Sequence, residues 1–173
     1  TSTREMTTAV LGARTPVVVW VAPEGAQAAS AGFFLLMAAD FAVMAPATNT
    51  GAAHPVGGQG ETIEGILGKK VEEDAAANVR ALAARRGRDV ALAEKAVLES
   101  RSFTAEEALA AKLIDLVAAD LPALVAGLEG RTFEKPPGET RRLALAGAVV
   151  REFSMNPVQR FLSTLLRPAA GQT

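Results

Sequence analysis

The sequence contains no cysteine and no tyrosine, and a single histidine among its 173 residues. Without cysteine, the chain has no disulfide, no thiolate metal site and no cysteine nucleophile. One histidine also disfavours a protein metal site, so we expect no metal. The 18 basic and 19 acidic side chains leave a net charge of −1. This balance offers no basic excess for binding phosphates, which argues against a nucleic-acid-binding protein.

Long apolar runs are also scarce. Residues 28–47 are almost wholly apolar and long enough to cross a membrane. However, Gly32, Asp40 and Pro46 interrupt them, and we predict a helix followed by a strand instead. No signal peptide is visible at the start, and the chain is expected to be soluble. A hydrophobic content of 49% over 173 residues is typical of one globular domain.

The apolar pattern predicts helices alternating with short buried strands, which is typical of an α/β fold with a parallel sheet. Gly and Pro interrupt residues 46–68, which predicts a long functional loop. The expected helices cover residues 3–13, 28–39, 69–86, 89–99, 120–128 and about 156–166, with a further short one after the Thr104–Glu107 capping box. The expected strands cover 17–22, 41–45 and 113–117, and residues 141–153 form a strand pair or edge; residues 131–140 form a polar turn or linker.

Ser30 is the first candidate catalytic residue. It follows a buried strand and a glycine turn, and it precedes a helix among small residues, Ala29, Ala31 and Gly32. A helix N-terminus supplies N–H groups that can stabilise an oxyanion, so this position suits a nucleophile. From the local sequence alone, the pattern favours a simple N-cap serine, because such serines are common.

Lys69 and Lys70 are predicted to open a helix. A lysine near the positive end of a helix, or partly desolvated, has a lowered pKa and can act as a general base. The alternative is two solvated lysines that pair with Glu73 and Asp74 one turn later.

His54 follows Ser30 by 24 residues, which permits a Ser-His arrangement. Asp115, inside an expected strand, could orient that histidine. Both residues also have structural interpretations: His54 as a loop residue that packs or hydrogen-bonds, and Asp115 as the end of a strand.

Several short motifs in a fixed order resemble the NfeD membrane-bound serine proteases of the Clp-protease/crotonase-like superfamily. The resemblance covers roughly residues 1–130. It is carried by Pro16-Val-Val-Val-Trp-Val-Ala-Pro23, Gly25-Ala-Gln-Ala-Ala-Ser30-Ala-Gly32, Met44-Ala-Pro46, Gly51-Ala-Ala-His-Pro-Val56, Lys69-Lys70-Val71, Arg86-Gly87-Arg88, Thr104-Ala-Glu-Glu-Ala108 and Leu113-Ile-Asp-Leu-Val117.

The resemblance implies a Ser-Lys dyad. Ser30 would be the nucleophile, Lys70 the general base with Lys69 as the alternative base, and the N–H of Ala31 an oxyanion donor. The implied substrates are peptides with hydrophobic segments, and the implied partners are stomatin-like membrane proteins. The family further implies a homodimer, no cofactor, and membrane association with the catalytic domain outside the cytoplasm.

The family's layered fold of stacked β-α units also implies a domain division. Residues 1–130 would form the Clp-like protease domain, and residues 131–173 an extension leading toward a membrane segment that the sequence lacks. The family's first β-α-β portion ends in a Gly-Gly turn that supplies a second oxyanion donor. We expect that portion to lie upstream of Thr1, so that the chain is an N-terminally truncated fragment.

Three alternatives accompany this interpretation. The first is a Ser30–His54 peptidase, with or without Asp115, as in the Clp proteolytic subunits. The second is an inactive binding or scaffold module that recruits a stomatin-like partner through residues 156–166. The third is a crotonase-type enzyme acting on acyl-CoA thioesters.

Overall fold

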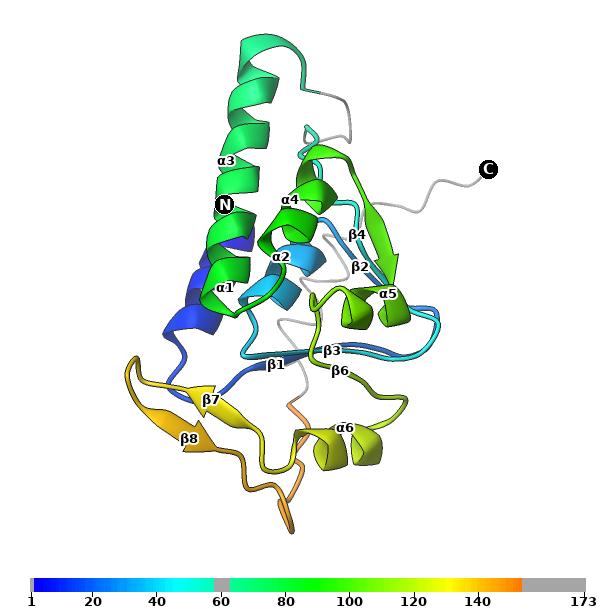
Figure 1. Cartoon of the computed structure of the whole chain (residues 1–173), viewed down its shortest axis with the longest axis vertical. Coiled ribbons are helices and arrows are strands. Elements are labelled where there is room, and N and C mark those ends of the chain that lie inside the picture. Colours follow the sequence, from blue (N-terminus) through cyan, green and yellow to red (C-terminus); the bar gives the residue numbers. More distant parts are fainter. Residues whose placement is uncertain (1, 58–62, 154–173) are drawn as a thin grey trace.

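The computed structural model describes residues 2–57 and 63–153, which form an α/β fold (Figure 1). Its helices are α1 (Ser2–Gly12), α2 (Ala31–Ala38), α3 (Gly65–Arg85), α4 (Val90–Leu98), α5 (Ala105–Ala110) and α6 (Leu121–Leu128). Its strands are β1 (Val18–Val21), β2 (Gln27–Ala29), β3 (Phe41–Met44), β4 (Asn49–Gly51), β5 (Ser102–Thr104), β6 (Leu116–Val117), β7 (Thr132–Glu134) and β8 (Thr140–Arg142).

The first sheet has the strand order β1-β3-β6 and is parallel throughout, which confirms the predicted parallel sheet. Its central strand β3 is buried along its whole length, as expected for a strand covered on both faces. Ala42 and Met44 face one core, which α2, α3, α4 and α5 complete. Phe41 and Val43 face a second core with α6. In Figure 1, α6 accordingly lies on the other side of this sheet from α2 and α3.

The second sheet, β2-β4-β5, corrects the prediction in two places. Strand β2 occupies the start of the expected 28–39 helix, so α2 begins only at Ala31. Strand β4 lies inside the expected 46–68 loop, where it pairs parallel with β2 and antiparallel with β5. Each of these strands has three residues. Strands this short are formed by pairing with distant segments, a signal that hydrophobic periodicity does not carry.

Helix α2 is the centre of the larger core. Phe33, Leu36 and Met37 on it are fully buried. Helix α3 packs against α4 and covers α2, so the element that follows Ser30 is held on several sides.

Three predicted helix starts are confirmed, whereas the start of α3, like that of α2, is wrong. Asp89 and Asp120 cap α4 and α6 through their side chains, and Thr104 and Glu107 form the expected capping box of α5. Helix α3, however, begins at Gly65, one turn earlier than expected. Lys69 and Lys70 therefore lie in its second turn, where the helix dipole acts less strongly on their charges.

Residues 131–142, predicted as a polar turn and the start of an edge, form the β7–β8 hairpin instead. Lys135 attaches the hairpin to the rest of the domain. Its ammonium lies 2.7 Å from the carboxylate of Asp40 and donates hydrogen bonds to the carbonyls of Val10 and Thr15. The hairpin could not be predicted from hydrophobic periodicity, because its one buried residue, Lys135, is polar. The domain division at residue 130 stays a prediction, and the expected 156–166 helix lies outside the described residues.

Charged residues are buried beneath β3. The carboxylate of Asp40 forms two ion pairs: Oδ1 lies 2.7 Å from Nη1 of Arg86, and Oδ2 lies 2.7 Å from Nζ of Lys135. Arg88 donates to Asp115 and to the carbonyls of Met37 and Ala39. Burial lowers the pKa of Arg88, an effect that the neighbouring Asp115 opposes. These ion pairs join α2, α3 and the hairpin to the sheet.

Within the described part of the chain, no helix combines the length and the apolar character that a membrane crossing requires. Residues 28–47, the strongest candidate from sequence, instead form β2, α2, β3 and the turns between them.

Candidate active site

Ser30 occupies a strained turn between β2 and α2. Its backbone has φ 49° and ψ −116°, a conformation that non-glycine residues rarely adopt. Its N–H donates to the carbonyl of Gly51 at 3.2 Å, which ties the turn to β4. Ser30 is at the N-cap position of α2, as the alternative interpretation expected, but its side chain makes no capping hydrogen bond. A strained, exposed serine on a strand-to-helix turn is the arrangement that presents a hydroxyl to a substrate.

The start of α2 provides the electrostatics that such a serine needs. The first N–H groups of a helix have no partner within it, and the N-terminus carries partial positive charge. Ala31, the first residue of α2, lies beside the hydroxyl of Ser30 and lines the same cleft. The structure therefore places the predicted oxyanion donor next to the candidate nucleophile.

A cleft of about 290 Å³ opens at Ser30. Its walls come from α1, α2, the segment after β4, and α3. The lining residues are Thr3, Arg4, Ser30, Ala31, Phe34, Ala53, Pro55, Val56, Val71, Asp74, Ala75 and Asn78. Most of these are apolar, so the cleft suits apolar side chains next to a hydroxyl group.

Lys70 immediately precedes Val71 on α3. Val71 lines the cleft, whereas the side chain of Lys70 is exposed to solvent. Lys69 and Lys70 are both exposed, and neither lines the cleft. Among the contacts of the described residues, no hydrogen bond joins Ser30 to either lysine. The structure thus brings Ser30 and Ala31 together and leaves Lys70 one residue outside the cleft wall.

His54 lies in the segment after β4 but points elsewhere. Its Nδ1 is 3.1 Å from the carbonyl of Val97 and 3.7 Å from the carboxylate of Glu72. It is not among the residues that line the cleft. Asp115 is held by Arg88 and the N–H of Ala42, so its carboxylate serves the sheet rather than His54.

Several residues in or next to the cleft were not predicted from the sequence. Arg4 on α1 forms an ion pair with Asp74 on α3 across one end of the cleft, although 70 residues separate them. Gly51 holds Ser30 and has φ 111°, and a Cβ there would lie 2.3 Å from the carbonyl oxygen of Arg101. An isolated glycine at the end of a strand hints at such a close approach, whereas the Arg4–Asp74 pair depends on tertiary structure alone.

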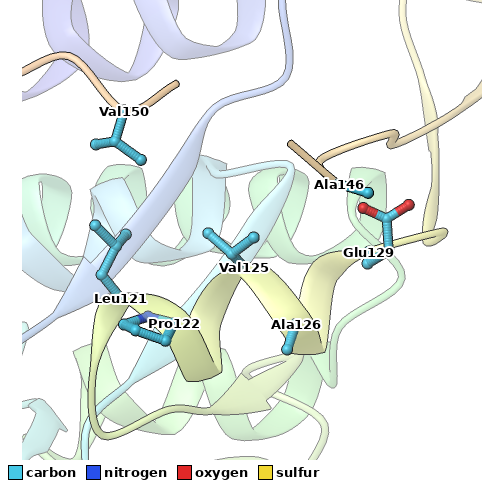
Figure 2. Close-up of a pocket in the computed structure, with 7 residues that line it drawn as sticks. All are labelled: Leu121, Pro122, Val125, Ala126, Glu129, Ala146 and Val150. Atoms are coloured by element: carbon cyan, nitrogen blue, oxygen red, sulfur yellow. The ribbon is translucent and has the colours of Figure 1, made fainter. Parts of the chain in front are cut away.

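A second cavity, of about 380 Å³, lies against α6 (Figure 2). It contains no nucleophile, and Glu129 is its one ionisable side chain. The cleft at Ser30, by contrast, places a serine hydroxyl beside apolar side chains. In the described ranges 2–57 and 63–153, no three His, Asp or Glu side chains gather to hold a metal ion.

One curated protein and several solved structures are similar to this chain. The membrane-bound protease PH1510 of Pyrococcus horikoshii is 35% identical over 124 residues, a match that covers 70% of this chain and 28% of that protein. The chain thus spans about 28% of the length of this curated relative. No protein-family model matches the chain.

Solved structures of the 1510-N membrane-bound stomatin-specific protease share the fold. A variant with a lysine replaced by alanine, in complex with a substrate peptide, superposes with a TM-score of 0.86 at 27% identity, covering 95% of this chain and 76% of that one. A variant with a serine replaced by alanine gives 0.81 at 28% identity, covering 90% and 76%. The 1510-N protease specific for a stomatin homolog from P. horikoshii gives 0.80 at 25% identity, covering 95% and 75%.

Proposed function

From the homology of this chain with the membrane-bound, stomatin-specific protease PH1510, we propose that it is the serine endopeptidase part of a membrane-associated protease. Ser30 acts as the nucleophile and Lys70 as the general base. The observation that carries the proposal is the strained backbone of Ser30, beside Ala31 at the head of α2 and open to an apolar cleft.

The mechanism follows from this arrangement. The Lys70 amine takes the proton of the Ser30 hydroxyl, and the oxygen attacks a peptide carbonyl. The N–H of Ala31 stabilises the oxyanion. When this intermediate collapses, the peptide C–N bond breaks and the protonated Lys70 gives its proton to the leaving amine. Lys70 then deprotonates a water molecule that hydrolyses the acyl-enzyme, which releases the second peptide product and restores the Ser30 hydroxyl.

The choice of lysine rests on the relatives and on α3. The serine and the lysine replaced in the 1510-N structures are separated by nearly the same interval as Ser30 and Lys70. A rotamer change of an exposed lysine next to Val71 brings its amine toward the cleft, because long side chains reach along a helix surface. Lys69 is the matched control, since it is equally exposed on the same turn.

The apolar cleft supports hydrophobic peptide segments as substrates, and the relatives' specificity supports a stomatin-like protein as their source. Homodimer formation remains part of the proposal by resemblance. No observation on the described residues favours the inactive module or the acyl-CoA enzyme, and the contacts of His54 with Val97 and Glu72 disfavour a Ser-His pair.

The test is a mass-spectrometric cleavage assay on hydrophobic peptides from stomatin-like proteins. It uses the gene's whole reading frame, so that any residues before Thr1 are present. Ser30→Ala and Lys70→Ala are expected to lose at least about a hundredfold in rate, whereas Lys69→Ala and His54→Ala retain most of it. Full activity of Lys70→Ala would reject the dyad. No cleavage by folded wild-type protein would reject the peptidase.

A further inference from the structure

The cavity of Figure 2 is an apolar groove on the outer face of α6, which we call the α6 groove. Its walls are Leu121, Pro122, Val125 and Ala126 of the helix, with Glu129 at one end and Ala146 and Val150 opposite. At about 380 Å³ it is larger than the Ser30 cleft, at about 290 Å³. A groove of this volume and composition accepts two or more apolar side chains.

The apolar side chains around the groove are unusually open to solvent. Of the residues that line it, Leu121 is 40% exposed and Val150 63%. Val149 and Phe153, next to Val150 in the sequence, are 82% and 98% exposed. Large apolar side chains left open beside an apolar groove mark a surface that another segment covers. Every exposed residue of this set belongs to α6 or to the last described residues of the chain.

We infer that residues 157–165 of the same chain dock as a helix in the α6 groove. In this segment Val158, Phe161, Leu162 and Leu165 follow the spacing of one helix face. The opposite face carries Arg160 and Ser163. The segment lies outside the described residues. Its sequence provides an apolar helix face that would cover the apolar groove.

The length of chain between groove and segment favours this occupant over a second copy of the protein. Val150 lines the groove, and Val158 follows only eight residues later. A tether of this length holds the segment at an effective concentration on the order of millimolar, well above that of a second molecule in ordinary solution. Docking would lead the chain away from the domain on the α6 side, which lies across the β1-β3-β6 sheet from α2 and the Ser30 cleft.

The absence of native cysteine makes disulfide trapping a direct test. The trapping variant combines Ala126→Cys with Leu162→Cys, which leaves Val158, Phe161 and Leu165 to dock. The control combines Ala126→Cys with Ser163→Cys, one residue further along and on the opposite helix face. Under mild oxidation of the full chain, we expect the trapping variant to form an intrachain disulfide about tenfold faster than the control. Equal rates, or disulfides formed only between two chains, would overturn the inference.

Hydrogen exchange provides a second measurement that needs no cysteine. Phe161→Asp should increase amide exchange in α6 by several-fold, because the groove loses its cover, whereas Ser163→Asp should leave it unchanged. Exchange in α3, beside the Ser30 cleft, serves as the internal reference for folding. Identical α6 exchange in wild type and Phe161→Asp would reject docking, whatever the peptidase assay shows.

Discussion

The N–H of Ser30 donates a hydrogen bond to the carbonyl of Gly51, 21 residues further along the chain. This bond joins the turn that exposes the candidate nucleophile to β4, and β4 in turn pairs with β5. The position of the Ser30 hydroxyl therefore depends on how closely these two strands approach.

Gly51→Ala tests that dependence. A Cβ at Gly51 would lie 2.3 Å from the carbonyl oxygen of Arg101, and φ 111° strains any other residue. We expect a loss of about 2–4 kcal/mol in the free energy of unfolding and a loss of peptidase activity in the protein that remains folded. Urea denaturation measures the first effect and peptide cleavage the second.

Gly12→Ala is the matched control, since nothing lies within 4 Å of a Cβ at that position. It should leave both stability and activity nearly unchanged. If Gly51→Ala behaves like Gly12→Ala, the close approach of β4 and β5 does not hold the serine.

Replacing Ser30 should separate stability from activity. Ser30→Gly relieves the strain of φ 49°, and we expect it to raise the free energy of unfolding by about 1 kcal/mol. Ser30→Ala keeps the strain and should match the wild type in stability. Both variants lose the hydroxyl and should be inactive. A glycine variant less stable than the alanine variant would show that the turn is not strained.

The buried ion pairs predict a large effect of Asp40→Ala. This change leaves Arg86 and Lys135, whose side chains are 10% and 5% exposed, without their shared carboxylate. We expect a loss of about 3–5 kcal/mol in the free energy of unfolding. The control is Glu139→Ala, which removes the exposed pair with Arg141 and should cost less than about 1 kcal/mol. Similar losses in the two variants would contradict a buried role for Asp40.

Local sequence signals were enough to find much of the fold. The β-branched run of β1 and the caps at Asp89, Thr104 and Asp120 are short-range features that act in the unfolded chain as well as the folded one. The parallel sheet and the candidate nucleophile were found for the same reason, because a serine after a strand and a glycine turn is a local pattern.

Non-local features were missed. Strands β2, β4 and β5 exist through their pairing, and the Arg4–Asp74 ion pair joins two helices far apart in sequence. The start of α3 was misplaced because Gly65 and Gly68 read as loop residues, although both lie within the helix. Lys135 lies in the predicted polar turn, and its burial depends on pairing with Asp40, which is distant in sequence.

The most direct test of the Ser30–Lys70 proposal is covalent labelling with a fluorophosphonate, followed by peptide mass spectrometry to locate the adduct. We predict an adduct on Ser30 that forms at least about a hundredfold more slowly in Lys70→Ala and at nearly the wild-type rate in Lys69→Ala. Folded protein that remains unlabelled at Ser30, or that labels equally fast without Lys70, would contradict the proposal.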